Sequence, residues 1–497
     1  MNVVLIYCDQ LSAKYLGCYG DPAAATPNID ALARRGVGFD NFIADCPVCM
    51  PARAGTITGL AVRRHGVYCN GYELGAELPT FPRRLQAAGV RTAGFGKFHL
   101  QCHARGAYND VRQYGFDEAA TTEDIRAGAW LDWVKAARPG AYEQAVATVW
   151  PTPHLRSYGS DKIDLLAEAD AARKRLGPDA GPYARHGAYE SRIPADATQT
   201  FWVGQKAVDF LSRQKPGRPF FLYASFVSPH DPYDPPAGYL ERIDPAAVAP
   251  PLPPTWRDDS APPRLFGESW ILRRFDGLDE GGWRGVRRHY LASMAEIDDQ
   301  VGRIVAAVEA AALSGETVIL FTADHGDMLG DHGLVYKGGW HYDACIRVPF
   351  IAAGAGAPGG RRVAAPAADL DVCPTVLELF GADCPWEHAG RSLAGVIAGG
   401  DADEGRGVTS ESFATYAVQE PYCHTRTMRT LRYRFSRHGD GAEQLFDLAA
   451  DPDEMVNLAG SPAHADICRQ LRRPLLAALP EQEYPLPTAG RLEGATH

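Results

Sequence analysis

Several short apolar runs in this chain end directly in polar residues, and this arrangement constrains the fold more than any other feature of the sequence. Residues 317–322 form the clearest run, and Asp324 and His325 follow it. Residues 3–7 form a similar run, and Asp9 and Gln10 follow it. Such β-branched and aliphatic runs are typical of strands buried on both faces of a parallel sheet. The sequence therefore predicts an α/β protein whose polar strand ends gather at the carboxyl edge of the sheet, where such sheets bind ligands.

Other segments extend this pattern. Three further apolar runs predict strands at residues 90–95, 220–226 and 347–351. Apolar residues at helical spacing, beginning at Met294 and Ile297, predict an amphipathic helix over residues 290–311 that packs on the sheet.

The pattern changes past about residue 385. Polar and apolar residues alternate over residues 430–435, and residues 443–448 form a second segment of this kind. Alternation is typical of antiparallel strands that bury one face. The end of the chain is therefore predicted to form a small antiparallel sheet.

Length and composition narrow the class of protein. A chain of 497 residues exceeds what one core usually holds, which predicts two domains of unequal size. A formal net charge of −11 without a long basic run argues against nucleic-acid binding. Eleven cysteines without a paired Cys-x-x-Cys zinc pattern predict mostly reduced, buried thiols. The chain lacks a basic leader and any run of roughly 20 apolar residues, so we expect no membrane association and a cytoplasmic location, with a periplasmic one left open.

The segment around Cys49 carries the strongest chemical signal. Cys49, Pro51 and Arg53 have the spacing Cys-x-Pro-x-Arg. Pro51 suits the first turn of a helix, so Cys49 is expected just before a helix N-terminus, where the helix dipole and Arg53 favour negative charge. Taken alone, this spacing also fits a buried cysteine beside a surface arginine, and the neighbouring motifs decide against that alternative.

Together with Thr58-Gly59, this segment resembles the active-site motif of the type I sulfatases, a branch of the alkaline-phosphatase-like hydrolases. Gly96-Lys97-Phe98-His99-Leu100 is close to a second motif of that family, and we expect this segment to be extended, which would put Lys97 and His99 on the same side. The turn containing Pro229 and His230 resembles a third motif. The resemblance extends from Asn2 to about Asn457. It implies that a formylglycine-generating enzyme converts Cys49 to formylglycine, whose hydrated aldehyde is the nucleophile.

The resemblance also assigns roles to residues at the strand ends. It implies one divalent metal ion, Ca²⁺ with Mn²⁺ or Mg²⁺ as alternatives, because the ligands are mainly hard oxygen donors. The implied metal ligands are Asp9, Gln10, Asp324, His325 and the modified Cys49. The implied catalytic residues are Cys49, Arg53, Lys97, His99, His230 and Lys337. Gln10 departs from the family's usual second aspartate and lowers the negative charge of the site.

The resemblance further implies a large, mostly parallel central sheet flanked by helices and a smaller C-terminal subdomain with an antiparallel sheet. We expect the catalytic domain over residues 1–385 and the subdomain over residues 386–497. Irregular insertions are expected at about residues 121–194 and 235–285. The first of these could line a substrate pocket, pack over the sheet or form a subunit contact, so a homo-oligomer is one alternative.

These features favour a sulfatase that hydrolyses a sulfate monoester of a small molecule or saccharide, with sugar, aryl and choline-like alcohols all open. A phosphonate monoester or phosphodiester hydrolase of the same superfamily is the first alternative, since Gln10 and His325 are common there. Lys97 and His99 favour the sulfatase, because the phosphonate hydrolases usually carry uncharged hydroxyl residues at those positions. An inactive metal-binding scaffold protein is the second alternative.

Overall fold

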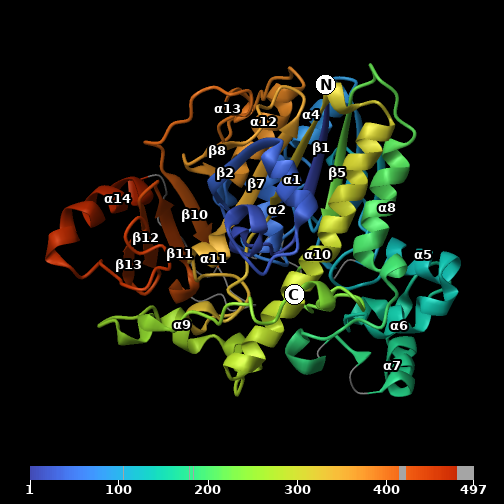
Figure 1. Ribbon diagram of the computed structural model, residues 1–497, viewed down its shortest axis with the longest axis horizontal. Coiled ribbons are helices and arrows are strands. Elements are labelled where there is room, and N and C mark those ends of the chain that lie inside the picture. The colour runs from blue at the N-terminus through green and yellow to red at the C-terminus, as the bar shows by residue number, and fades with distance from the viewer. Residues whose placement is uncertain (104–105, 178–179, 183, 414–420, 478–497) are drawn as a thin grey trace.

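A computed structural model describes residues 1–103, 106–177, 180–182, 184–413 and 421–477. A nine-stranded sheet forms its centre, and a separate four-stranded sheet lies to one side (Figure 1). The strands of the large sheet are β1 (Asn2–Cys8), β2 (Gly36–Ile43), β3 (Arg91–Gly96), β4 (Glu118–Thr121), β5 (Phe220–Phe226), β6 (Thr317–Ala323), β7 (Arg347–Gly354), β8 (Arg361–Val363) and β9 (Ala367–Ala368). The predicted α/β class and all five predicted strands of this sheet are confirmed.

The strand order is β4-β3-β5-β1-β6-β7-β2-β8, with β9 also paired to β2. β1 lies between β5 and β6 and runs parallel to both, so that Val4 pairs with Leu222 on one side and Ile319 on the other. β7 runs antiparallel to both of its neighbours. Every residue of β1, β5 and β6 is buried, which explains why these strands read as continuous apolar runs rather than alternating ones.

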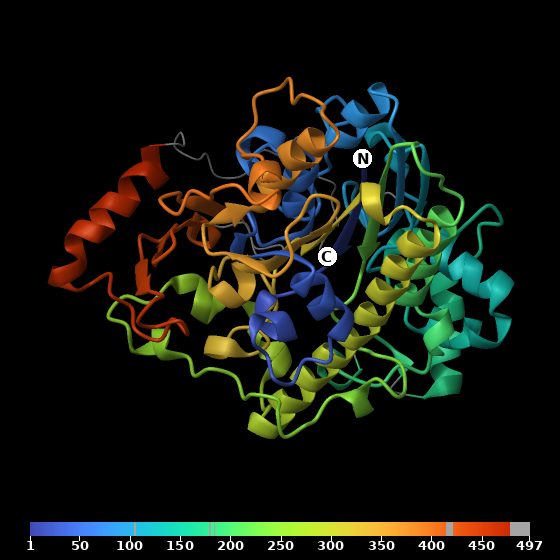
Figure 2. The same cartoon turned by 45° about the horizontal axis from the view of Figure 1, so that its top comes forward.

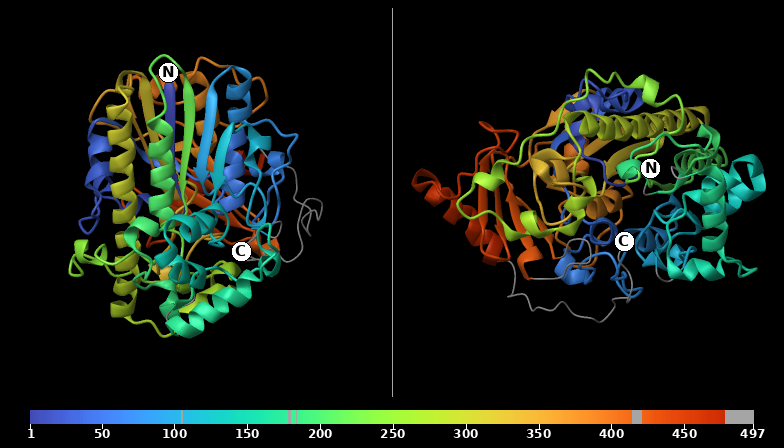
Figure 3. Two further views of the ribbon diagram at one scale, coloured as in Figure 1. Left: turned by 90° about the vertical axis from the view of Figure 1, so that its right-hand side faces the viewer. Right: turned by 90° about the horizontal axis from the view of Figure 1, so that it is seen from below.

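Helices cover both faces of this sheet, as the edge-on view in Figure 3 shows. One layer contains α1 (Pro27–Arg34), α8 (Gln199–Leu211) and α10 (Glu280–Ala310), and the other contains α2 (Cys49–Thr58), α4 (Phe81–Ala87) and α12 (Val372–Leu379). The predicted helix at 290–311 is therefore confirmed as part of α10, but it begins ten residues earlier, at Glu280. The first turns contain Gly281, Gly282 and Gly285 and little apolar periodicity, so the Asp279 N-cap, which accepts from the Gly282 amide, was the only local signal there.

The small sheet has the order β10-β11-β12-β13 and is antiparallel throughout, as predicted. Its strands are β10 (Val408–Ser412), β11 (Thr425–Arg429), β12 (Tyr433–His438) and β13 (Glu443–Asp447). The predicted strand at 430–435 is placed too early, because Thr430 closes the turn before β12 through hydrogen bonds with Tyr433. The last helix, α14 (Ala465–Ala477), packs on β11 and β12 and lies at the outer end of the molecule (Figure 2).

The first irregular stretch forms three short helices, α5 (Ala129–Ala137), α6 (Tyr142–Ala147) and α7 (Leu165–Leu176), on the side of the molecule opposite the small sheet (Figure 1). Its tryptophans pack towards α8: Trp130 donates to the carbonyl of Ala197, and Trp133 stacks on Phe201. The second stretch contains one short helix, α9 (Arg264–Glu268), among 3-10 turns. The division into domains at about residue 385 stays a prediction.

Candidate active site

Four neighbouring strands deliver polar side chains to one edge of the sheet. Asp9 follows β1, Asp324 and His325 follow β6, Lys97 follows β3 and His230 follows β5. Because β3, β5, β1 and β6 are consecutive in the parallel part of the sheet, these residues lie side by side at its carboxyl edge. Asp9, Lys97, Asp324 and His325 are fully buried, so the charges among them must be paired or bind a ligand.

Cys49 faces this edge from the first position of α2, one residue further into the helix than the sequence predicts. Its thiol donates to His325 Nε2 at 3.2 Å and lies 3.8 Å from Asp9 Oδ1. The side-chain oxygen of Asn70 accepts from the Met50 amide at 3.1 Å and so caps the first turn of the same helix. Asn70 itself lies in a turn, and from there it supports the helix that presents Cys49.

Arg53 bridges the two carboxylates from one turn further along α2. Its Nε donates to Asp324 Oδ2 at 2.8 Å, and its NH2 group donates to Asp9 Oδ2 at 3.0 Å. The remaining nitrogen donates to the Lys97 carbonyl and to Ser225. Arg53 is therefore a buried residue held on both sides, and the alternative of a surface arginine is excluded.

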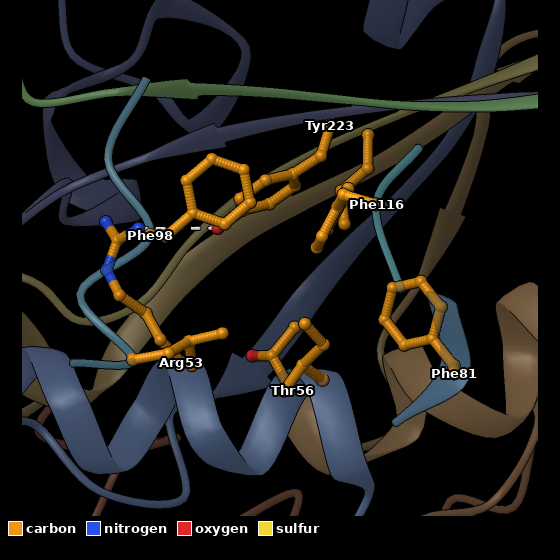
Figure 4. Close-up of a pocket in the computed structure, with 9 residues that line it drawn as sticks. Arg53, Thr56, Phe81, Phe98, Phe116 and Tyr223 are labelled. Atoms are coloured by element: carbon orange, nitrogen blue, oxygen red, sulfur yellow. Dashed lines mark hydrogen bonds between the residues drawn. The ribbon is translucent and has the colours of Figure 1, made fainter. Parts of the chain in front are cut away.

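Aromatic side chains lie behind the guanidinium (Figure 4). Phe98, Phe116 and Tyr223 line a small cavity of about 10 Å³ there, together with the stem of Arg53. This volume is no larger than one water needs. The cavity is thus a packing gap among mostly apolar side chains, and it has no room for a substrate.

Asp9, Cys49, Asp324 and His325 have the geometry of a metal-binding group, since each offers one ligand atom and these atoms lie within 4.8 Å of one another. Arg53 occupies Oδ2 of both aspartates, which leaves the two Oδ1 atoms facing His325 Nε2 at 3.9 and 3.7 Å. His325 Nδ1 donates to the Gly326 carbonyl at 3.0 Å, and burial lowers the pKa of His325. A neutral imidazole with its Nε2 lone pair directed at two carboxylates fits a divalent cation.

Gln10 takes a different position from the other predicted ligands. Its backbone has φ 64°, and its amide N–H donates to Asp324 Oδ1 at 2.9 Å. Its side-chain nitrogen donates to Asp327 at 2.5 Å, and its side-chain oxygen accepts from Lys337 Nζ at 2.6 Å. The structure therefore brings Gln10 and Lys337 to the site, but it pairs them with each other.

Lys97 lies between two carboxylates, with Nζ 2.6 Å from Asp9 Oδ2 and 3.0 Å from Asp124 Oδ2. Burial would lower the pKa of Lys97, but Asp124 and Asp9 raise it well above its usual value. The same contacts act on Asp9: burial would raise its pKa, but Lys97 and Arg53 hold it well below the usual range. Both side chains are therefore charged at neutral pH.

His99 is buried next to His103, with parallel rings 4.2 Å apart. The segment is not extended as expected, because β3 ends at Gly96 and His99 has φ 48°. Glu123 fixes this bend by accepting from the amides of Phe98 and His99. Burial and His103 lower the pKa of His99 well below its usual value, so its imidazole is neutral.

His230 lies across from Lys97 in a turn after β5. Its Nδ1 donates to the Asp231 carbonyl at 2.7 Å, and its Nε2 is 3.8 Å from Asp124 Oδ2. Arg126 and Asp234 form a bidentate ion pair that links this turn to the segment containing Asp124.

Glu123, Asp124 and His103 also lie at the site, although the sequence did not predict them. Glu123 and Asp124 stand at the start of the first irregular stretch, which was left unassigned, and His103 follows the Lys97 motif by six residues. A pair of acidic residues carries no local signal of the site, because its partners belong to other strands. His424, on the small-sheet side, pairs with Glu411 at 2.8 Å.

The fold is a mostly parallel sheet between two helical layers, and carboxylates and a histidine at its strand ends face a helix N-terminus. These features define an alkaline-phosphatase-like hydrolase. Comparison with known proteins gives the family. Residues 1–382 match the Sulfatase family model, and residues 330–481 match the model described as N-sulphoglucosamine sulphohydrolase, C-terminal. The chain belongs to the sulfatase family and is a sulfuric ester hydrolase.

Individual relatives agree with this assignment. A choline-sulfatase of Rhizobium meliloti is 30% identical over 471 residues, covering 93% of this chain and 83% of that protein. An arylsulfatase of Clostridium perfringens is 28% identical over 510 residues, covering 97% and 95%. The crystal structure of a phosphonate monoester hydrolase of Agrobacterium radiobacter superposes with a TM-score of 0.76 at 25% identity, covering 96% and 95%. Among the helices in the described ranges, none has both the length and the apolar character needed to traverse a bilayer.

Proposed function

We propose that the protein hydrolyses sulfate monoesters by a formylglycine formed from Cys49. The supporting observation is the position of Cys49: it begins α2 and contacts His325 and Asp9, with Arg53 one turn along the same helix. A nucleophile in this position would meet both the helix dipole and the metal-binding group. A formylglycine-generating enzyme would be needed during maturation.

We infer that Asp9, Asp324, His325 and the modified residue 49 hold one divalent cation, with Gln10 as a further candidate ligand. Calcium is our first choice because carboxylate and amide oxygens dominate, and manganese is second because of the imidazole. When bound, the cation would polarise a sulfate oxygen and favour the ionised form of a hydrate hydroxyl.

The first chemical step transfers the sulfuryl group to residue 49. An ionised hydroxyl of the hydrate attacks sulfur in line, the bond between sulfur and the alcohol oxygen breaks, and a sulfate ester of residue 49 forms. Arg53 and Lys97 hold the hydrate, while His230 and Lys337 bind the ester group. His230 Nε2 is the candidate proton donor to the departing alcohol, since its Nδ1 is already committed to the Asp231 carbonyl.

The second step releases sulfate without attack of water on sulfur. His99 accepts the proton of the second hydroxyl of residue 49, the bond between carbon and the sulfate oxygen breaks, and the aldehyde re-forms. Water then adds to the aldehyde and restores the hydrate. Burial and His103 lower the pKa of His99, so the ring is neutral and one of its nitrogens carries the lone pair that this role requires.

The alternative is hydrolysis of phosphonate monoesters or phosphodiesters with the same nucleophile. Gln10 and the similarity to the Agrobacterium phosphonate monoester hydrolase favour it. We place the sulfatase first because Lys97 and His99 act on the protons of the nucleophile, whereas Gln10 changes the charge of the metal site and contacts Lys337.

Mass spectrometry of the tryptic peptide of residues 36–53 tests the nucleophile. The protein should be produced with and without a formylglycine-generating enzyme, and the fraction of aldehyde at residue 49 compared with the specific activity. We expect the two to rise together, and we expect Cys49→Ala to be folded and inactive. Full activity from protein whose Cys49 is uniformly an alkylatable thiol would contradict the proposal.

A further inference from the structure

Asp124 is a buried carboxylate among the cationic side chains of the site. Its side chain is 10% exposed, and its two oxygens meet different partners. Oδ2 lies 3.0 Å from Lys97 Nζ and 3.8 Å from His230 Nε2, and Oδ1 lies 2.8 Å from His103 Nε2. Asp124 therefore touches or faces three basic groups, two of which we place in contact with the reacting ester and nucleophile.

His99, His103 and Asp124 offer atoms close enough together for a second metal site. The relative orientation of the two histidine rings argues against one. A metal ion binds imidazole nitrogens in the plane of each ring. The rings of His99 and His103 are stacked with an angle of 3° between their planes and centroids 4.2 Å apart. Parallel stacked planes do not intersect, so no single point lies in both. Asp124 thus acts through its charge and its ion pairs.

That charge persists at neutral pH. Burial would raise the pKa of Asp124, but His103 and Lys97 hold it well below its usual range. Burial would also lower the pKa of His103, but Asp124 and Glu123 raise it to about 9. The site thus contains an ionised carboxylate on the side where an anionic substrate must bind.

A buried anion beside an anion-binding site discriminates by charge. A substrate oxygen held by Lys97 or His230 would lie roughly 5 Å from the Asp124 carboxylate, because one hydrogen-bonded cation lies between the two. At the effective dielectric constant of a protein site, an additional unit of negative charge at about that distance changes an equilibrium constant by roughly a hundredfold. This repulsion grows in proportion to the charge of the ester, so an ester with one negative charge is repelled about half as strongly as one with two.

Resting on the proposed function, we propose that Asp124 is a specificity-determining residue that restricts the site to singly charged esters and rejects phosphate monoesters, which are dianions at neutral pH. Sulfate monoesters and phosphodiesters both carry one charge. The rejection of dianions is therefore separate from the choice between sulfur and phosphorus.

The test compares three substrates that share a 4-nitrophenol leaving group: the sulfate, the phosphate and the methyl phosphate diester. Asp124→Asn and Asp124→Ser remove the charge, and Asp124→Glu keeps it. Melting curves identify the variants that fold. For each folded protein, kcat/KM for the phosphate monoester is divided by kcat/KM for each singly charged ester at pH 8.

We expect both ratios to rise by about tenfold or more in the neutral variants and to stay within a few-fold of wild type in Asp124→Glu. Neutral variants that lose activity equally on all three substrates would overturn the proposal and leave Asp124 a structural residue. The wild-type protein gives a test that needs no variant: it must hydrolyse the methyl diester with higher kcat/KM than the phosphate monoester, and the reverse order would also overturn the proposal. If the diester exceeds the sulfate, the proposed sulfatase function fails while the assignment of Asp124 stands.

Discussion

Lys337 Nζ donates to the side-chain oxygen of Gln10 at 2.6 Å across 327 positions of the chain. Burial would lower the pKa of Lys337, but Cys49 and Asp9 raise it, so the lysine is a cation that holds the amide oxygen. The other end of the same amide donates to Asp327. The orientation of Gln10 is thereby fixed between a donor and an acceptor, which bears on its predicted role as a metal ligand.

Two substitutions test separately the effect of charge at position 10 and the role of the Gln10 side-chain oxygen. Gln10→Glu keeps the shape and adds a negative charge beside Asp9 and Asp324, so the dissociation constant of a divalent cation should fall by about tenfold or more. Gln10→Met removes the oxygen and should weaken binding if Gln10 is a ligand. Titration against a competing chelator measures both, with Asp324→Ala as the reference for lost metal. Unchanged affinity in Gln10→Met would show that Gln10 serves Lys337 and not the metal.

Proton donation by His230 predicts a dependence on the leaving group. His230→Ala should lower kcat/KM for an alkyl or sugar sulfate by roughly 10²–10⁴, because a poorly acidic alcohol needs the proton as it departs. The loss for 4-nitrophenyl sulfate should be much smaller, since nitrophenolate leaves without it. His230→Gln serves as a control of similar size. Equal losses on both substrates would assign His230 to binding alone.

His99 as the base of the second step predicts a trapped intermediate. His99→Ala should lower turnover by roughly 10²–10⁴ while leaving the first step intact. Mixing the variant with an aryl sulfate should then give one burst of phenol and a mass gain of one sulfuryl group on the peptide of residues 36–53. A variant that is slow without a burst or a modified peptide would show that His99 acts before or during the first step.

Glu296 predicts a pH dependence of stability away from the site. It is buried on α10 beside Thr198, and burial raises its pKa to about 8 from 4.5. Between these values the native state binds a proton that the unfolded state has lost, so the free energy of unfolding falls as pH rises through this range. Glu296→Gln should remove this fall and stabilise the protein at pH 8.5 by at most roughly 5 kcal/mol, with a much smaller effect at pH 5. Denaturant melts at both pH values measure it, and an equal effect at both would contradict the assignment.

The sequence predicts the fold well because its main strands are buried on both faces. Residues 317–322 and 220–226 can bury every side chain only in the middle of a sheet, and both lie there. The family resemblance identified residues that the structure gathers at one edge, such as Asp9 and Asp324. Neither the strand pattern nor the family resemblance predicts Asp124, because its contact with Lys97 spans 27 positions and depends on the pairing of β3 with β4.

Local conformation was also harder to predict than strand content. The prediction for Lys97 and His99 assumed an extended chain, whereas Glu123 captures the amides of Phe98 and His99 and holds a bend with φ 48° at His99. The hydrogen bonds to Glu123 are tertiary interactions, so the local sequence around His99 does not predict them. The same holds for Asn70, which caps a helix twenty positions before it.

The central claim is that this site acts on sulfate esters in preference to phosphorus esters of the same charge. The most direct measurement is kcat/KM of formylglycine-containing wild-type protein for 4-nitrophenyl sulfate and for the 4-nitrophenyl monoester of phenylphosphonate, which share a leaving group and a single negative charge. The account predicts the higher value for the sulfate, because Lys97 and His99 serve the hydrate that sulfatases use. A higher value for the phosphonate would contradict it and make the protein a phosphonate monoester hydrolase.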